Sequence, residues 1–176
     1  MKKFLVIGSN SFAGSDFIDF LLKKNFKVYG VSRNKEIDSE HLRYKKNKKI
    51  KNFKFNKINL NLKKDIDKLI QIIKKNKISY IINFAAQGMV AESWVNPQDW
   101  YLTNVVSNSI LIKELSKLKI KKYLNFSTPE VYGHTPSLLK ESNFFAPTTP
   151  YAISRSAQDF NLLAYYNTYN FPVVFT

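Results

Sequence analysis

Apolar and polar positions follow two patterns that alternate along this chain. Short apolar runs bounded by polar or glycine residues predict strands at 3–7, 27–33, 53–61, 79–86, from 123 onward and at 171–176. Between most of them, apolar residues recur every three or four positions, which predicts amphipathic helices from 11, over 63–76, from 97 to about 118 and over 151–169. This alternation implies right-handed crossovers and an α/β fold with a doubly wound parallel sheet in the strand order 3-2-1-4-5-6.

The length suits one domain. With 176 residues and 44% hydrophobic content, the chain can bury a sizeable core but does not accommodate a second full domain. No internal repeat or low-complexity linker divides it, so we expect a single domain over residues 1–176. The last residues form a strand-like apolar run with nothing after it, and we therefore expect an N-terminal fragment of a longer protein.

The charge is strongly positive: 28 basic residues against 13 acidic ones give a net charge of +15. Such a balance suggests nucleic acid as a partner. The lysines are spread through the chain, however, and only residues 44–55 (YKKNKKIKNFKF) form a real cluster, without a nucleic-acid-binding motif. We therefore predict a lysine-rich solvated surface with a mobile loop at 44–55 and no nucleic-acid partner. The charge should also attract anionic nucleotides.

Several classes of function are excluded or disfavoured. The chain has no cysteine, which excludes disulfides, thiol catalysis and cysteine-based zinc sites. His41 and His134 share no metal-ligand spacing with carboxylates, so no metal site is predicted. The apolar run near the N-terminus is only five residues long and breaks at Gly8, which favours a strand over a signal peptide, and no stretch reaches the ~18 apolar residues of a membrane span. We expect a cytoplasmic protein.

A glycine-containing turn follows the first strand. Residues 8–14 (GSNSFAG) lead from the strand into the first helix. Glycine lets the backbone approach a phosphate, and the free N–H groups of a helix N-terminus favour negative charge. Taken alone, this pattern fits a phosphate-binding loop and an ordinary strand-to-helix turn about equally well.

The most chemically suggestive residues lie between 123 and 155. Tyr151 and Arg155 are i and i+4 on one helix, so the phenol and the guanidinium project from the same face. A neighbouring cation favours the phenolate, which is one way to make a general base. Ser127, Thr128 and Glu130 follow a buried strand, at the sheet edge where open α/β folds place their chemistry.

These motifs resemble a known family. STPEVYG (127–133) followed by YAISR (151–155) is similar to the Ser/Thr-x-x-VYG and Tyr-x-x-x-Lys pair of extended short-chain dehydrogenases, the nucleotide-sugar epimerases and dehydratases. The chain departs from the family's motifs with Arg155 where lysine is usual, with Ser11 in place of the middle glycine of Gly-x-x-Gly-x-x-Gly, and with Asn59 where an acid follows the third strand. The resemblance implies a Rossmann-type NAD(P)-binding domain that lacks the family's C-terminal substrate domain.

The resemblance also implies a set of cofactor-binding residues. They lie in the glycine turn, after the third and fourth strands and in the Tyr151 helix: Gly8, Ser11, Phe12, Ala13, Gly14, Asn59, Leu60, Phe84, Ala85, Ala86, Tyr151 and Arg155. At the end of the second strand, an acid would select NAD and an arginine would pair with the 2′-phosphate of NADP. Arg33 occupies this region and favours NADP over NAD, with a solvated loop charge as the alternative interpretation of Arg33.

The family chemistry gives each candidate a role. Tyr151 would take the proton of the sugar 4-hydroxyl, Thr128 would hydrogen-bond the same oxygen, and Arg155 would hold the cofactor ribose. A glutamate two residues after the threonine distinguishes dehydratases, and Glu130 stands there, which predicts a 4,6-dehydratase with affinities to the dTDP-glucose and GDP-mannose enzymes. Substrate contacts are expected from Gln87, Ser93, Asn104, Ser127, Thr128 and Glu130, and family analogy implies a homodimer.

Other interpretations stay open. Glu130 is alternatively a surface carboxylate or a helix cap. The protein is alternatively a nucleotide-sugar 4-epimerase or reductase of the same family, or a dinucleotide-binding module without catalysis. The last interpretation is consistent with Ser11, with Arg155 and with the missing C-terminal part.

Overall fold

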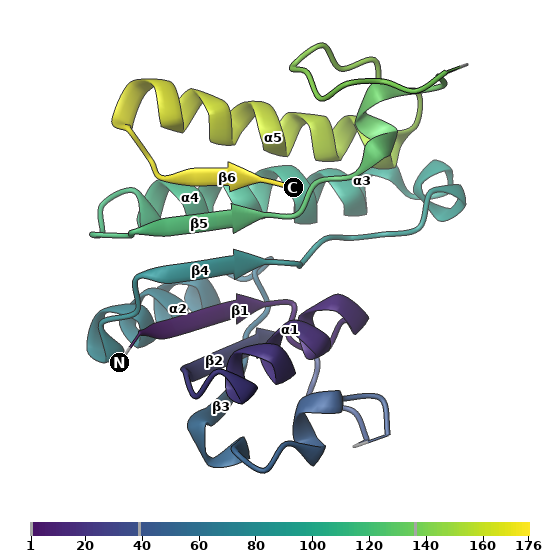
Figure 1. The fold of residues 1–176 in the computed structure, drawn as a ribbon. Helices are drawn as coiled ribbons and strands as arrows, with labels where there is room; N and C mark the ends of the chain where they lie inside the picture. The colour runs from purple at the N-terminus through teal and green to yellow at the C-terminus, as the bar shows by residue number, and fades with distance from the viewer. Residues whose placement is uncertain (1, 39, 136) are drawn as a thin grey trace.

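The protein folds around one parallel sheet. Figure 1 shows the computed structural model, which describes residues 2–38, 40–135 and 137–176. Six strands lie in the order β3-β2-β1-β4-β5-β6, all parallel, which confirms the predicted doubly wound fold. Their bounds are β1 Lys3–Ile7, β2 Lys27–Ser32, β3 Phe53–Lys57, β4 Tyr80–Asn83, β5 Lys122–Asn125 and β6 Val173–Phe175.

The helices connect successive strands. The α-helices are α1 (Phe12–Lys23), α2 (Lys63–Asn76), α3 (Pro97–Trp100), α4 (Asn108–Leu115) and α5 (Pro150–Tyr169). A π-helical segment, η4 (Tyr101–Ser107), joins α3 to α4, so the region predicted as one helix from 97 is helical but wider in its middle. Short 3₁₀ turns lie at η1 (Arg43–Lys46), η2 (Ile50–Asn52), η3 (Ala91–Trp94) and η5 (Pro129–Tyr132).

Each face of the sheet has its own apolar core. On one face, Leu5, Tyr29 and Ile81 pack with residues of α2, α4 and α5. On the other face, Val6 and Val28 pack with α1 and with the segment around η1. Figure 1 shows this division, with α1 on the near side of the sheet and α2 and α4 on the far side. The central strands β1, β2 and β4 are mostly buried because their side chains alternate between two faces that are both covered.

Two sequence-based expectations differ from the structure. The third strand was expected to extend to residue 61 but ends at Lys57, because the Asn59 amide donates to the Asp65 carboxylate (2.7 Å) and the chain turns into α2. The segment 44–55 was expected to be a mobile loop. Instead it forms η1, η2 and the start of β3, anchored by the fully buried Tyr44, whose hydroxyl donates to Glu36 (2.8 Å).

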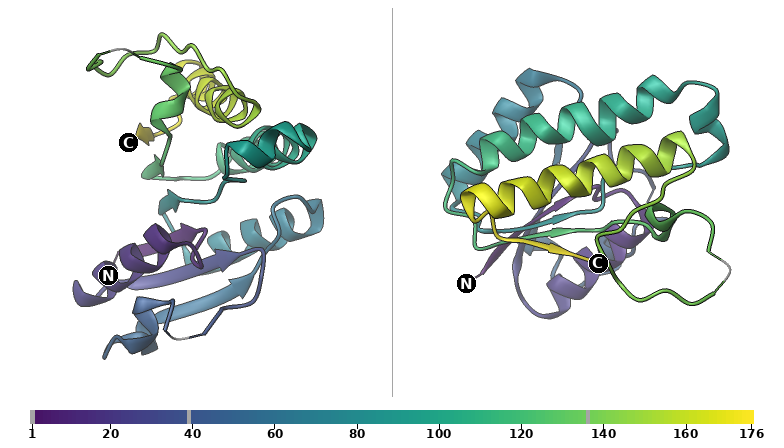
Figure 2. Two further views of the ribbon diagram at one scale, coloured as in Figure 1. Left: turned by 90° about the vertical axis from the view of Figure 1, so that its right-hand side faces the viewer. Right: turned by 90° about the horizontal axis from the view of Figure 1, so that it is seen from above.

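The topology brings the functional candidates to one edge of the molecule. The carboxyl ends of all six strands point the same way, and the left view of Figure 2 faces them. Ligands of open α/β sheets bind at this edge, where the strand order reverses between β1 and β4. No helix in the described residues has the length and apolar character that crossing a lipid bilayer requires.

Candidate active site

The turn after β1 approaches the loop after β4 closely. Gly8 has a φ of +85°, and a Cβ there would lie 2.8 Å from the backbone nitrogen of Ala85. Both facts require glycine at this position. The same region is tied to β2, since the Gly8 amide donates to the Val31 carbonyl (2.8 Å) and the Asn10 amide to the Ser32 hydroxyl (3.0 Å). The turn is therefore held at the switch point between β1 and β4.

Ser11 begins α1 as its N-cap. Its hydroxyl accepts from the Gly14 amide (3.0 Å) and donates to the Gly8 carbonyl (2.7 Å). Gly14 packs so tightly that a Cβ there would lie 2.3 Å from the Gly8 carbonyl oxygen. Ser11 thus closes the turn that the family closes with glycine, and its hydroxyl is engaged with the backbone. The N–H groups of the first turn of α1 face the sheet edge and favour an anion.

A cleft of about 370 Å³ lies at the ends of β1, β2, β3 and β4. It is lined by eight of the residues proposed to bind the cofactor: Gly8, Ser11, Arg33, Asn59, Leu60, Phe84, Ala85 and Ala86. Gln87, proposed for the substrate, lines it too, and its side chain accepts a long hydrogen bond (3.5 Å) from Arg33. The described lining does not include Phe12, Ala13, Gly14, Tyr151 or Arg155.

Sequence reasoning missed several residues of this cleft, among them Asn10, Ser32, Asn34, Ile37, Asn61 and Thr103. Ser32 was identifiable, since it ends the second strand. Asn61 and Thr103 meet only through the fold, where the Asn61 amide donates to the Thr103 hydroxyl (3.1 Å) across 42 positions. No local sequence pattern predicts such a pair.

The second group of candidates lies at the end of β5 and the start of α5. Thr128 follows β5 in extended conformation and leads into η5, which carries Glu130 exposed to solvent. Tyr151 lies in the first turn of α5, capped by the Thr149 hydroxyl, which accepts from the Ala152 amide (3.1 Å). Ser127 and Thr128 line a second cleft, of about 550 Å³, between the ends of β5 and β6 and the segment 129–145. Glu130 and Tyr151 are outside the lining of both clefts.

Arg155 has a contact that the sequence did not suggest. Its side chain is buried, and its guanidinium donates to the carbonyl of Phe126, directly after β5. Asp159, one turn further along α5, is also buried and accepts from the Ser127 hydroxyl and from the Asn125 side-chain amide (2.8 Å). Burial raises the pKa of the Asp159 carboxyl above its usual range, while the bond from Ser127 and the charge of Arg155 oppose this shift.

Ser93 and Asn104 are buried and join the loop after β4 to α5. The Ser93 hydroxyl accepts from the Tyr151 amide (3.2 Å) and donates to the Val90 carbonyl (2.6 Å). The Asn104 side chain accepts from the Gln87 amide (2.7 Å) and donates to the Gln87 carbonyl and the Ser154 hydroxyl (2.9 Å). Asn104 lies in the π-helical segment η4. Both residues therefore hold the start of α5 against the loop that borders the cleft at the ends of β1 to β4.

Comparison with known proteins identifies the family. Residues 5–176 match the family described as GDP-mannose 4,6 dehydratase. The dTDP-D-glucose 4,6-dehydratase of Dictyostelium discoideum is 30% identical over 195 residues, which cover 100% of this chain and 43% of that protein. The chain thus spans about half the length of the relatives it matches, or less.

Two solved structures share the fold. The UDP-Glc/GlcNAc 4-epimerase of Campylobacter jejuni superposes with a TM-score of 0.86 at 23% identity, covering 99% of this chain and 52% of that one. The dTDP-glucose 4,6-dehydratase of Bacillus anthracis, solved in complex with NAD, superposes with a TM-score of 0.82 at 26% identity, covering 99% and 53%. With the family match over residues 5–176, the chain belongs to the GDP-mannose 4,6-dehydratase family of extended short-chain dehydrogenases, which comprises nucleotide-sugar dehydratases and epimerases.

Proposed function

We propose that this chain provides the cofactor-binding and catalytic part of a nucleotide-sugar 4,6-dehydratase. The observation that carries the proposal is the pair Thr128 and Glu130, two residues apart after the end of β5, next to the helix α5 that carries Tyr151 in its first turn. The dehydratase relative that matches the whole chain supports the same choice. The sugar and the nucleotide base are left open between dTDP-glucose and GDP-mannose.

The cleft at the ends of β1 to β4 suits a dinucleotide. Gly8 and Gly14 leave room where any Cβ would collide with backbone, so the turn can pass close to a pyrophosphate. The cleft walls would hold the rest of the cofactor through Arg33, Asn59 and the backbone of Ala85. When bound, NAD or NADP supplies the acceptor for hydride from sugar C4 and its donor to C6.

The protein side chains handle the protons. Tyr151 acts as the general base that removes the proton of the sugar 4-hydroxyl, and Thr128 hydrogen-bonds the same oxygen. Glu130 removes the C5 proton, which the oxidised C4 makes acidic, and passes a proton to the C6 hydroxyl, so that the C6–O bond breaks and water leaves. Gln87, which lines the cofactor cleft, is proposed to contact the sugar, whereas the buried Ser93 and Asn104 are proposed to act by holding Tyr151 and the loop.

The product of the reaction tests the proposal. The chain is incubated with NAD or NADP and with dTDP-glucose or GDP-mannose, and the 4-keto-6-deoxy sugar is measured by mass spectrometry. Because Glu130 carries the step that only dehydration needs, Glu130→Gln should reduce product formation at least a hundredfold while leaving cofactor binding unchanged. Glu40→Gln, an exposed carboxylate outside the lining of both clefts, is the matched control. Full product formation by Glu130→Gln would rule out the assigned role.

The cofactor preference depends on Arg33. Family structures contain NAD, but Arg33 lines the cleft, and a guanidinium there can pair with a 2′-phosphate. We therefore propose NADP as the preferred cofactor, with at least tenfold tighter binding than NAD. Binding is followed by thermal stabilisation, since a ligand of the folded state raises the melting temperature. Arg33→Ala should remove the preference, and Lys35→Ala, whose exposed side chain lies outside the cleft lining, should keep it. If Arg33→Ala and the unmodified chain prefer NADP over NAD to the same extent, Arg33 is a solvated surface charge and does not select the cofactor.

An epimerase is the second candidate. The 4-epimerase of Campylobacter jejuni shares the fold as fully as the dehydratases do. In an epimerase the hydride returns to C4, so the product would be the C4 epimer with its C6 hydroxyl retained. Binding of cofactor without turnover of any sugar would instead support the non-catalytic module.

A further inference from the structure

Three consecutive residues at the end of β5 are each held by a polar side chain of α5. The side-chain nitrogen of Asn125 donates to the Asp159 carboxylate, and the side-chain oxygen of Asn125 accepts from the Gln158 side chain (2.9 Å). The Phe126 carbonyl accepts from Arg155, and the Ser127 hydroxyl donates to Asp159. We call Arg155, Gln158 and Asp159 the α5 clamp. All three side chains are at least 95% buried, and the two bonds to Asn125 are buried, whereas Ser127 and Asp159 also line the second cleft.

The chemistry of the clamp suits its task. Arg155 and Asp159 are i and i+4 on α5 and therefore project from the same face of the helix. A buried guanidinium requires a nearby opposite charge, and a buried carboxylate requires donors for both oxygens. Asp159 meets both needs, because its charge acts on Arg155 and its two oxygens accept from Asn125 and Ser127. Removing either charge leaves the other uncompensated.

We infer that the α5 clamp positions Thr128 relative to Tyr151, and that Arg155 is a positioning residue acting through the Phe126 carbonyl rather than a ligand of the cofactor ribose. The two proposed catalytic residues come from the two elements that the clamp joins. Tyr151 lies one turn before Arg155 on α5, and Thr128 directly follows the three clamped residues. This inference rests on the proposed function only in assigning Thr128 and Tyr151 to one reaction.

The type of cation distinguishes the two roles. Lysine is the residue that the family uses at this position, so a ribose ligand should tolerate Arg155→Lys. A clamp should not, since lysine lacks the planar fork of donors and is a strongly hydrated point charge. The cofactor cleft also lacks Arg155 in its described lining.

Amide exchange measured by NMR on the whole chain tests the inference. The Phe126 amide donates to the Asn83 carbonyl (3.2 Å) and the Ser127 amide to the Thr176 carbonyl (2.9 Å), so both report on the end of β5. In Arg155→Lys and in Asp159→Asn, exchange of these two amides should accelerate at least tenfold. The Thr128 amide resonance should shift in both. The Gly8 and Ile58 amides also form hydrogen bonds between the ends of neighbouring strands. Their hydrogen exchange should change less than twofold.

Cofactor titrations and two further variants complete the test. The affinity for NAD and NADP should stay within threefold in Arg155→Lys. If an α5 variant fails to fold, Ser127→Ala removes one clamp bond from the strand side and should produce the same faster exchange at the Phe126 and Ser127 amides. The control Asn167→Ala, on the exposed face of α5, should leave the exchange unchanged. Unchanged exchange in Arg155→Lys, whatever the cofactor affinity, would overturn the inference, as would uniform acceleration at all four amides. If no sugar is turned over, the proposed reaction fails while the exchange result still decides on the clamp.

Discussion

At the scale of single residues, Asp159 combines burial with charge. Its side chain is 1% exposed, and burial is the largest influence on its carboxyl, raising the pKa above the usual value. The carboxyl accordingly binds its proton more tightly in the folded than in the unfolded chain. The groups that act on this carboxyl are the Arg155 guanidinium, the Ser127 hydroxyl and the Asn125 side-chain amide. The charge of Asp159 in turn acts on the Tyr123 phenol.

The stability of the protein should therefore depend on pH through Asp159. Between the unfolded-state pKa of about 4 and the raised folded-state pKa, the folded chain holds more protons than the unfolded one. The Asp159 contribution to the free energy of unfolding is fully present below this window and is lost as pH rises through it. Urea unfolding at a series of pH values should show this loss in the unmodified chain and not in Asp159→Asn. The control Asp67→Asn, on an exposed carboxylate, should keep the loss. Parallel pH profiles for the chain and Asp159→Asn would contradict the assignment.

At the scale of elements, periodicity predicts the helices and strands well where one face alone is buried. The predicted helix 63–76 coincides with α2, whose buried residues Ile66, Leu69, Ile70 and Ile73 follow the helical spacing. The apolar spacing did not predict the π-helical segment η4, whose Asn104 bonds to Gln87 and Ser154, residues that are distant in sequence. The α5 clamp was missed for the same reason. Its only local signal is a buried helix face that carries Arg155 and Asp159 instead of apolar residues.

The start of α1 offers a quantitative prediction. The Ser11 side chain accepts from the Gly14 amide and is the N-cap of the helix. Ser11→Ala removes this bond and should lower the free energy of unfolding by about 1 kcal/mol, or the melting temperature by about 2–4 °C for a chain of this size. Ser11→Gly, which restores the family residue, should lose only a few tenths of a kcal/mol. Calorimetry distinguishes the two, and equal losses would show that the hydroxyl does not act as a cap.

At the scale of the whole molecule, α5 and η4 lie side by side and leave apolar residues exposed. The right view of Figure 2 shows the long helical segment ending in α4 alongside α5. Leu102 and Val106 on η4, and Ile153 and Phe160 on α5, are exposed although they are apolar. Pairs at i and i+4 or i+7 share one side of a helix. We propose that this surface forms the interface of the homodimer that family analogy implies.

Association should therefore depend on this helical surface. Sedimentation velocity should detect a dimer of the 20.5 kDa chain, and Val106→Lys should shift it towards monomer because a charge would have to be buried at the interface. Phe144→Lys is the matched control, since Phe144 is 90% exposed in the loop before α5. A dimer that persists in Val106→Lys, or a monomer at all concentrations of the unmodified chain, would contradict this mode of assembly.

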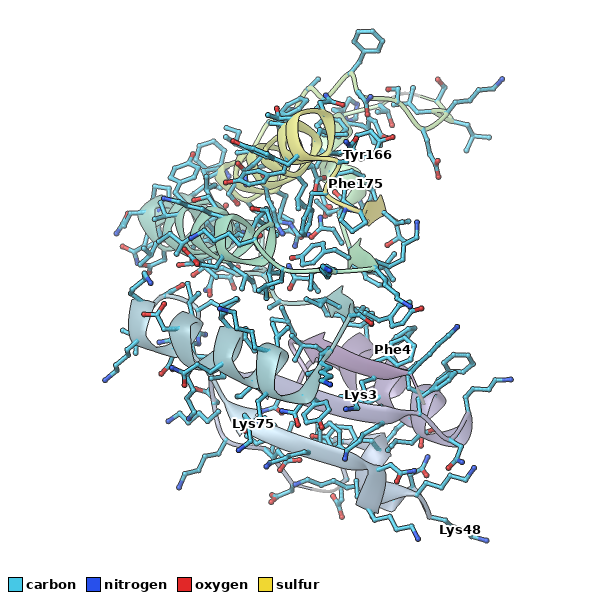
Figure 3. All side chains as sticks on the ribbon, turned by 90° about the vertical axis from the view of Figure 1, so that its left-hand side faces the viewer. Lys3, Phe4, Lys48, Lys75, Tyr166 and Phe175 are labelled. Carbon is cyan, nitrogen blue, oxygen red and sulfur yellow. The ribbon has the colours of Figure 1, made fainter. Side chains whose placement is uncertain are left out.

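The exposed lysines on and near β3 affect how this edge of the sheet can contact other protein molecules. β3 ends the sheet on one side, and its Lys54 and Lys57 are exposed. Figure 3 shows Lys48, in the segment leading to β3, at the periphery of the molecule. A strand at a sheet border presents unpaired backbone groups that can template intermolecular strand pairing, and lysines oppose the approach of a second copy by repulsion and by the penalty of desolvating them. We therefore expect the exposed lysines of β3 to oppose strand pairing with a second copy along this edge of the sheet.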